Sequence, residues 1–522
     1  MKKIISVILL LVIMMSCCLC ACENDKDKSK DVSTANEVMS LEYYNKSDKK
    51  IGVVSGTIQE EILFKNFPNA EICPYNTLPD LVTALNAKNI DAFSCASSNF
   101  IQVNRENPSI LGIEKPLATF DCAFAFPKTE KGAKLRDEFN EFLAISKYEG
   151  LIDSLNQKWI YNDSANEKVK LSDLKGDKGE IKFVTTGTTP PYSFLVNNQV
   201  SGFDVELAAR FCRDYGYSLD IDTVDFSAIM AGLGSSKYDM AANCILVTEE
   251  RKQSVNFSDT IYQTNIMLAV LSPNAKDNQN FFENIASSFE KTFIVDNRWE
   301  LIVQGLLVTV IISVISVIIG TILGFLLCLV FRTKIKFFHI LVNIYIKIFQ
   351  GTPLLVILMI LYYIVFANSA IDNVLVAIIA FSLNFAAYVC EILKSSIDAI
   401  DKGQMEAALS LGYTRRQGFM HIVLPQAIAI SINVYRGQVI SLVKLTSIVG
   451  YIAIQDLTKA SDFIRSRTFE PFFPLIVTAI IYFLICALIA FVIKQIEKKL
   501  IKRKKLTEEM QEDENLKEEK DD

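Results

Sequence analysis

The chain has 522 residues, of which 51% are hydrophobic and 21% are charged, and its formal net charge is −6. This length allows two or three domains, and the hydrophobic content is typical of a membrane protein. The slightly acidic balance, without a basic patch interleaved with aromatic residues, argues against nucleic acid as a partner. Most long apolar runs lie beyond residue 300, which predicts a soluble part followed by a membrane part.

The first 22 residues have the pattern of an export signal. Lys2 and Lys3 precede an apolar run from Ile4 to Met15, which is shorter than the roughly 20 residues of a membrane-spanning helix. The tetrad Leu19-Cys20-Ala21-Cys22 resembles a bacterial lipobox, which would make Cys22 the lipid-bearing first residue of the mature protein. The alternative is an uncleaved signal anchor.

Residues 23–49 are polar and charge-rich and predict a flexible tether. Strand and helix patterns alternate after it, beginning with a buried strand at Ile51 to Val54 and helical periodicity at Gln59 to Phe67. A second such segment covers 181–272 and is joined to the first by a polar linker at 164–180. This alternation predicts an α/β fold with parallel strand pairing.

Cysteines of the soluble part show neither a disulfide framework nor zinc-ligand spacing. We expect them to be buried small hydrophobic residues, and no metal site is predicted. They are Cys73, Cys95, Cys122, Cys212 and Cys244.

Motifs in both α/β segments resemble those of the polar amino acid binding proteins, the bilobed receptors of ABC importers. Residues 181–262 contain Thr189-Pro-Pro-Tyr192, Gly202-Phe-Asp204 and Thr248-Glu-Glu-Arg251, and resemble the amino-terminal half of such a receptor. Residues 50–163, with Phe124-Ala-Phe-Pro-Lys128, resemble its second lobe and return segment. The resemblance implies one circularly permuted bilobed receptor, with 181–272 as the first-lobe half. The alternative is two incomplete modules from decayed tandem receptors.

A ligand site follows from the same resemblance. Arg251 stands where the family has an arginine that holds the ligand carboxylate, and its guanidinium fork suits that group. The turn Ser55-Gly56-Thr57 opens a helix whose N–H groups and dipole favour an anion. Tyr192 and Phe226 can supply apolar walls. The implied ligand is therefore a small molecule with a carboxylate.

Positions that would bind the ligand's ammonium group do not match the family. Its first-lobe acid and stacking aromatic fall on Thr186 and Thr189, and its second-lobe acid falls on Ala96, beside Cys95. An ammonium buried without a counter-ion is costly. Three interpretations stay open: another acid such as Asp121 serves, the ligand is not a plain α-amino acid, or the receptor is degenerate and delivers or gates for another binding protein.

Five apolar segments predict membrane-spanning helices within a membrane domain at 299–497. A linker at 273–298 precedes this domain, and a charged cytoplasmic tail at 498–522 follows it. The five segments lie near 302–331, 340–367, 373–393, 423–443 and 472–493.

Lysine and arginine gather on alternate connections, at Arg332 to Lys336 and around Arg415, which the positive-inside rule places in the cytoplasm. The soluble part then lies on the extracytoplasmic side of a multi-pass protein of the bacterial plasma membrane. The outer loop with Lys459, Arg465 and Arg467 runs against this trend.

Lys444 lies inside an apolar run, where contact with lipid would be costly. We expect it to face protein or a water-filled path, with Glu391 as a candidate ion-pair partner.

The connection after the third span contains Glu406-Ala407-Ala408, then Gly412, then Ile422-Val-Leu-Pro425. This spacing resembles the EAA loop of ABC importer permeases, in which a short helix, a glycine turn and a second amphipathic segment dock on the ATPase. The resemblance covers 299–495 and implies an all-α type I importer domain with five transmembrane helices, acting as a permease homodimer or heterodimer with a separate ABC ATPase.

The combined resemblance implies a fused substrate-receptor and permease subunit of an ATP-driven importer for amino acids or related small carboxylate-bearing solutes. No GxxxxGK[ST] loop occurs, so this chain is expected not to be an enzyme, to carry no cofactor, and to depend on ATP bound by its partner. The alternatives are a sensor derived from a permease and a ligand-gated channel. The channel is disfavoured because Ser447-Ile-Val-Gly-Tyr451 lacks the following glycine of a potassium filter.

Overall fold

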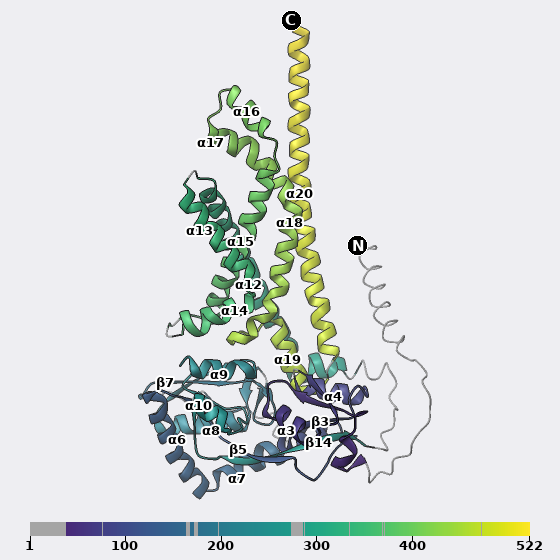
Figure 1. Ribbon diagram of the computed structural model, residues 1–522, viewed down its shortest axis with the longest axis vertical. Coiled ribbons are helices and arrows are strands. Elements are labelled where there is room, and N and C mark those ends of the chain that lie inside the picture. The colour runs from purple at the N-terminus through teal and green to yellow at the C-terminus, as the bar shows by residue number, and fades with distance from the viewer. Residues whose placement is uncertain are drawn as a thin grey trace, which may run out of the picture.

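The computed structural model describes residues 38–521 except for 76, 163–167, 172–175, 197, 273–285, 287, 334, 368, 370 and 471. An α/β part occupies one end of the molecule, and long helices extend away from it (Figure 1). The predicted lipidation site Cys22 lies outside the described residues.

The α/β part has two lobes, and lobe A (residues 38–122 and 262–272) is built on one mixed sheet in the order β2-β1-β3-β14-β4. Strands β1 and β2 and strands β1 and β3 are parallel, whereas β14 is antiparallel to β3, β4 and β5. The strands are β1 (Lys50–Val54), β2 (Glu71–Tyr75), β3 (Ala92–Ala96), β4 (Ile110–Gly112), β5 (Ala118–Cys122) and β14 (Tyr262–Leu271). The helices are α3 (Ile58–Asn66), α4 (Leu78–Asn86) and α5 (Ser97–Glu106).

Lobe B (residues 123–261) has a second sheet in the order β11-β7-β12-β6-β13, and a small sheet formed by β10, β9 and β8. The strands are β6 (Ala125–Pro127), β7 (Glu180–Thr185), β8 (Thr188–Thr189), β9 (Ser193–Val196), β10 (Gln199–Ser201), β11 (Ser218–Thr223), β12 (Met240–Ala241) and β13 (Val255–Phe257). The helical segments are α6 (Glu130–Tyr148), α7 (Leu151–Asn156), η2 (Gln157–Tyr161), α8 (Phe203–Tyr215), α9 (Phe226–Gly234) and α10 (Glu249–Ser254).

Each lobe takes strands from both halves of the α/β sequence. Strand β6 comes from the first half and pairs with β12 and β13 of the second, while β14 comes from the second half and pairs with β3 of the first. The buried indole of Trp159 also donates to Glu206 Oε2 on α8 (2.8 Å). The predicted bilobed α/β fold is confirmed, and neither half of the sequence completes either of the two large sheets by itself.

Folded structure begins before residue 50, earlier than the predicted end of the tether. Leu41–Tyr44 forms a 3₁₀ helix, η1, and Tyr44 is buried in lobe A. Asn69 N–H also donates to Asn45 Oδ1 (3.1 Å). The tether prediction therefore fails for this stretch, because its few large apolar side chains find a hydrophobic surface on the lobe.

The helical part is all-α, as predicted. Its elements are η3 (Glu290–Ile294), η4 (Val295–Asn297), α12 (Trp299–Phe331), α13 (Lys336–Gly351), α14 (Leu354–Ile360), η5 (Leu361–Val365), α15 (Asn373–Asp398), α16 (Lys402–Ser410), α17 (Arg415–Gly418), η6 (Phe419–Val423), α18 (Leu424–Leu445), η7 (Thr446–Ile452), α19 (Leu457–Thr468) and α20 (Phe473–Asp521).

Within the described residues, four helices are long and apolar enough to cross a membrane, and a bent pair would make a fifth span. That pair, Lys336–Gly351 and Leu354–Val365, bends by 105°. The break falls at Pro353, because proline lacks a backbone N–H and pushes the preceding Thr352 into an extended conformation (φ −110°, ψ 131°).

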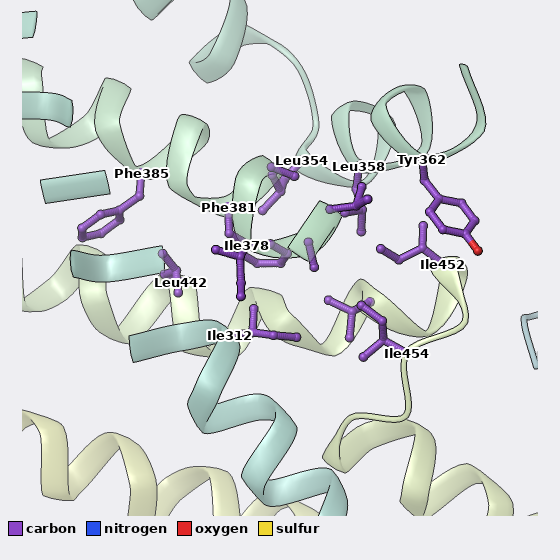
Figure 2. Packing of buried hydrophobic residues seen from close by; sticks show 14 of the residues in the cluster. Ile312, Leu354, Leu358, Tyr362, Ile378, Phe381, Phe385, Leu442, Ile452 and Ile454 are labelled. Carbon is purple, nitrogen blue, oxygen red and sulfur yellow. The ribbon is translucent and has the colours of Figure 1, made fainter. Parts of the chain in front are cut away.

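Close packing of α12 against α15 forms the centre of the bundle. A side chain at Gly324 would place its Cβ 2.6 Å from Val389, so only glycine permits this approach. Figure 2 shows apolar side chains from α12, α14, α15, α18 and the segment after α18 meeting in one cluster. Those labelled are Ile312, Leu354, Leu358, Tyr362, Ile378, Phe381, Phe385, Leu442, Ile452 and Ile454.

We predict that a fragment of residues 38–272 unfolds in one cooperative transition, because both large sheets need strands from both halves. A fragment ending at residue 163 should not fold, since it lacks the central strand β14. Calorimetry and circular dichroism of the two fragments provide the measurement. Two separate transitions in the long fragment, or a folded short fragment, would instead favour decayed tandem modules.

Candidate functional site

The cleft between the lobes is closed by direct contacts. The hydroxyl groups of Ser98 on α5 and Tyr192 in lobe B are hydrogen-bonded, and Asn99 Nδ2 donates to Pro190 O (3.0 Å). The Ser98, Asn99 and Tyr192 side chains are buried. The predicted wall residue Tyr192 therefore acts as part of the contact between the lobes.

Arg251 lies on α10, and the ring of Phe226 is close to it. Its guanidinium Nη1 donates to Leu246 O (3.1 Å), and its Cζ lies 5.6 Å from the centre of the Phe226 ring. Burial lowers the pKa of Arg251, whereas the charges of Glu250 and Glu61 raise it. Glu61 belongs to α3 of lobe A, so Arg251 in lobe B is influenced by a charge of the other lobe.

The turn before α3 has the conformation that an anion site needs, but its own helix supplies an acid. Gly56 adopts φ +71°, and Thr57 is the N-cap residue without a side-chain capping bond. Thr57 Oγ1 donates to Val54 O (2.7 Å), and Gly56 N–H is 3.4 Å from Glu60 Oε2. Glu60 therefore lies where a ligand carboxylate is predicted and would have to move aside.

Thr186 and Thr189 do meet, and they form an uncharged network with Asn243. Thr186 Oγ1 donates to Asn243 Oδ1 (2.8 Å), and Asn243 Nδ2 donates to Thr189 Oγ1 (3.2 Å). The two threonine hydroxyl groups are 3.0 Å apart. Asn243 has no local sequence signal for this role, because its partners lie more than 50 positions away along the chain.

The part of lobe A at the end of β3 is apolar. Cys95 and Ala96 are buried there, and Ala96 belongs to a cluster with Ile62, Leu246 and Cys122. Ala96 itself therefore offers no charge, whereas the carboxylates of Glu60 and Glu61 in the same lobe belong to α3.

Asp121 does not serve as the missing acid. Phe120 and Cys122 on the same strand, β5, pack into the apolar cluster of the cleft, and neighbouring strand residues face opposite sides. The Asp121 carboxylate instead accepts a hydrogen bond from Gln263 Nε2 (3.0 Å). The first of the three open interpretations is therefore wrong for Asp121.

Asp204 is a buried acid near Cys122 and Cys244 that was not among the predicted ligand-site residues. It lies at the start of α8, and its Oδ2 accepts a hydrogen bond from Cys244 N–H (3.0 Å). Burial raises the pKa of Asp204 to about 7. The only sequence signal for it is its place in Gly202-Phe-Asp204, which also fits a purely structural role.

A second site is the junction between the α/β part and the helical part, where α19 contacts both lobes (Figure 1). Lys459 Nζ lies 2.7 Å from Asp225 Oδ1 of lobe B, and the Lys459 side chain is only 4% exposed. Arg465 forms an ion pair with Asp80 at the start of α4 in lobe A. Two of the three basic residues that oppose the positive-inside trend, Lys459 and Arg465, thus have acidic partners on the lobes.

Apolar and aromatic contacts complete the junction. The hydroxyl groups of Tyr238 in lobe B and Tyr362 in η5 are 2.9 Å apart. Gly187 lies against α19, since a side chain there would place its Cβ 3.0 Å from the Phe463 ring. The Arg467 guanidinium lies 5.0 Å from the centre of the Phe194 ring. The two parts are therefore packed together in the described structure.

The predicted coupling segment forms a helix-turn-helix at the end of the bundle far from the lobes (Figure 1). Gly412 turns the chain between α16 and α17 with φ +84°, and Tyr413 N–H bonds to Ala408 O (3.1 Å). Ala408 is buried, whereas Glu406 and Ala407 are exposed. Pro425 is placed in the first turn of α18, where a missing N–H is tolerated.

Leu411 is 77% exposed and Tyr413 is 43% exposed on this helix-turn-helix. Large apolar side chains presented together on a surface indicate a partner surface. The geometry therefore suits a docking knob.

Lys444 is exposed on α18, and Glu391 accepts a hydrogen bond from Gln350 Nε2 (2.6 Å). No ion pair between Lys444 and Glu391 occurs in the described part of the chain, so the suggested pairing is wrong. In a single copy, Lys444 faces outward from an apolar helix.

The family profile described as "Bacterial extracellular solute-binding proteins, family 3" matches residues 181–514. Among curated proteins, a putative glutamine transport system permease protein GlnP of Rickettsia felis is 37% identical over 205 residues, which are 38% of this chain and 93% of that protein. The arginine transport system permease protein ArtQ of Bacillus subtilis is 36% identical over 201 residues, which are 38% of this chain and 92% of that protein. A solved amino acid ABC transporter with histidines is 30% identical, with a TM-score of 0.37, covering 42% of this chain and 99% of that one.

We predict that reversing Lys459 to Asp lowers the melting temperature of the full chain in detergent by several degrees. The change places a second carboxylate beside Asp225, whose side chain is 38% exposed although Lys459 is buried. We therefore expect a cost between about 1 kcal/mol, as for an exposed pair, and about 3 kcal/mol, as for a buried one. Adding Asp225→Lys should restore most of the loss. As a control, Lys252→Asp should have little effect, because the Lys252–Glu249 pair is exposed. A double variant no more stable than the single one would mean that the two residues do not pair.

Proposed function

The chain belongs to the bacterial extracellular solute-binding proteins of family 3 and, through its helical part, to the amino-acid ABC transporter permeases, and we propose that it is the fused receptor and permease subunit of an ATP-driven importer. The main support for this proposal is that the receptor and the coupling segment lie at opposite ends of the helical bundle. The receptor lobes sit on one end of the helices, and the exposed helix-turn-helix of α16 and α17 lies at the other (Figure 1). A solute received at one end and ATP hydrolysed at the other fit this layout.

An ABC ATPase is the proposed partner at α16 and α17. Glu406, Leu411 and Tyr413 are exposed there and offer a charge and two apolar anchors to a cleft on another subunit. ATP is proposed to bind only to that subunit, so this chain acts as a transport subunit without a cofactor rather than as an enzyme.

A second permease unit is the proposed partner along α18. Its outward face has Ile430 and Val434 together with Lys444, and an ammonium facing lipid within an apolar helix would be costly. A neighbouring permease, homodimeric or heterodimeric, would cover these residues and place Lys444 at a shared, water-accessible path. The four or five crossings in one copy support the same proposal, because so few helices cannot enclose a pathway.

We place the receptor on the extracytoplasmic side of the bacterial plasma membrane. Arg332 follows the end of α12, Lys394 lies near the end of α15, and Arg415 begins α17, which lies at the end of the bundle far from the receptor; these positions agree with a cytoplasmic location for that end. The basic residues on the receptor side, Lys459 and Arg465, are paired with lobe carboxylates and so do not count against this orientation.

The proposed ligand is an amino acid or a related small solute with a carboxylate, bound between Arg251 and the start of α3. Binding requires the lobes to open and Glu60 to move from Gly56. Thr186, Thr189 and Ala96 supply no charge for an ammonium group, so a ligand with a modified or absent amino group suits this cleft better than a plain amino acid.

A degenerate receptor that works as a sensor is the second candidate. It is favoured by the contacts of Ser98 with Tyr192 and of Asn99 with Pro190, which hold the lobes together across the cleft. This chain would then report or gate for another binding protein rather than capture the solute itself.

We predict that Gly412→Val and Glu406→Lys uncouple ATP hydrolysis from transport while ligand binding stays unchanged. Valine at φ +84° is strained and would distort the turn, and lysine reverses the charge offered to the ATPase. ATPase and uptake assays on reconstituted complexes, with Gly234→Ala as a control glycine in open space, provide the measurement. Normal coupled transport in both variants would exclude this segment as the docking site.

We predict that Arg251→Ala reduces ligand affinity by tenfold to several thousandfold, because losing a buried charge-assisted contact costs about 2 to 5 kcal/mol. The exposed neighbour Lys252→Ala should leave affinity unchanged. A thermal-shift screen of the full chain against amino acids and their N-acyl and keto-acid analogues would identify the ligand class.

In that screen, removing the amino group from a ligand should cost little affinity. Tight binding of an unmodified amino acid, with a large loss on deamination, would contradict this and point to Asp204 as the missing acid. Binding of no compound would favour the sensor.

A further inference from the structure

Two cysteines of the receptor approach each other at the point where the chain passes between the lobes. Cys122 is the last residue of β5 in lobe A, and Cys244 lies in lobe B after β12. Their sulfur atoms are 3.3 Å apart although the residues are 122 positions apart in the sequence. Both are free thiols in this structure, and no other sulfur–sulfur contact is formed among the cysteines that the structure describes.

Backbone contacts hold the two cysteines in position from both sides. Cys122 forms an isolated antiparallel bridge with Leu246, two residues after Cys244. Ala123 N–H donates to Ile245 O (3.2 Å), and Val247 N–H donates to Asp121 O (2.9 Å). Closing the remaining distance between the sulfur atoms therefore needs side-chain adjustment rather than movement of one lobe past the other.

Cys244 is also held in an uncommon backbone conformation. Its φ is +50°, a region that side-chain-bearing residues seldom adopt and that usually persists only where the surroundings fix it. Its N–H donates to the buried Asp204 carboxylate (3.0 Å), which anchors the residue with its sulfur towards Cys122.

We propose that Cys122 and Cys244 form a disulfide bond in the exported receptor. The inference rests on the proposed extracytoplasmic location of the lobes, since disulfides form and persist in oxidising compartments. The oxidant is the disulfide of an exported thiol oxidoreductase or a small-molecule disulfide.

The exchange balances in two steps. The thiolate of one cysteine attacks the oxidant's disulfide, forming a mixed disulfide and releasing one thiol of the oxidant. The second cysteine thiolate then displaces the other oxidant sulfur, forming the Cys122–Cys244 bond. Two protons and two electrons leave the cysteine pair, and the oxidant is reduced to its two thiols.

The disulfide is expected to form while the chain folds, before the lobes close. The neighbouring Cys244 thiol and burial raise the pKa of Cys122, so its reactive thiolate is scarce once the lobes close. Cys122 is 1% exposed, and a bond formed before closure would then be shielded from reductants. It would tie the first crossing between the lobes to lobe B.

The test is made on the full chain purified from membranes of a host with an oxidising export compartment. Thiols are alkylated with iodoacetamide in denaturant without reductant, and the peptides are mapped by mass spectrometry. We expect a linked peptide pair containing Cys122 and Cys244 that separates with dithiothreitol, while Cys95 and Cys212 are alkylated. Alkylation of both Cys122 and Cys244 before reduction would overturn the proposal.

Variants give the matched controls. Cys244→Ala should abolish the linked pair and free Cys122 for alkylation, whereas Cys212→Ala should leave the pair intact. Reduction should lower the melting temperature of the unaltered chain by roughly 5 °C, as expected for a disulfide closing a long loop, and should not affect Cys244→Ala. An equal effect of reduction on both chains would count against a stabilising bond.

The location of the receptor is tested separately with Cys73, a partly exposed thiol on β2 outside the pair. A membrane-impermeant maleimide should label it in intact cells and fail to label Cys73→Ser at that position. Labelled Cys73 with unlinked Cys122 and Cys244 would overturn the disulfide while the proposed function stands. Unlabelled Cys73 in a chain that is labelled after lysis would contradict the extracytoplasmic placement itself.

Discussion

The sharing of strands between the two halves of the receptor sequence is the constraint on which the rest of the structure depends. Strand β14 lies in the middle of the lobe A sheet, so lobe A cannot close its core until the chain has passed through lobe B and returned. This forces two crossings between the lobes and fixes the cleft between them. Strand β14 ends at Leu271, and the sequence continues from there to the helical bundle.

Ion pairs made by buried basic residues hold the two lobes against the helical part. Lys459 and Arg465 are almost fully buried on α19, and charges are tolerated in such places only when paired. One partner, Asp225, belongs to lobe B and the other, Asp80, to lobe A, so a single short helix meets an acid from each lobe. Relative movement of the lobes would separate one of these pairs or move α19, which connects the end of α18 with α20. The receptor and the permease are thus mechanically connected in one polypeptide.

Local sequence patterns predicted the features that depend on local physics. The spans of the bundle follow from apolar runs, whereas the turn at Gly412 and the bilobed fold were expected because the motifs around Glu406, Gly202 and Arg251 resemble those of known families. Contacts between residues that are distant in the sequence could not be predicted from local patterns. Asp80 and Arg465 are 385 positions apart, and Asn243 meets Thr186 only in the folded chain. Residues 38–49 were misjudged for the same reason, since the buried surface that receives Tyr44 is formed by distant strands. The lipobox and the ligand remain predictions, as do the domain limits other than the end of the tether.

Transport by the reconstituted complex tests the central claim most directly. The full chain and its ATPase would be placed in proteoliposomes with ATP at the α16–α17 side, and a pool of radiolabelled amino acids and their carboxylate analogues would be supplied at the receptor side. The account predicts that at least one solute accumulates against its gradient and that accumulation stops when ATP is replaced by a non-hydrolysable analogue. Solute or ion flux that is independent of ATP, or ATPase stimulation by the receptor without accumulation of any solute, would contradict it.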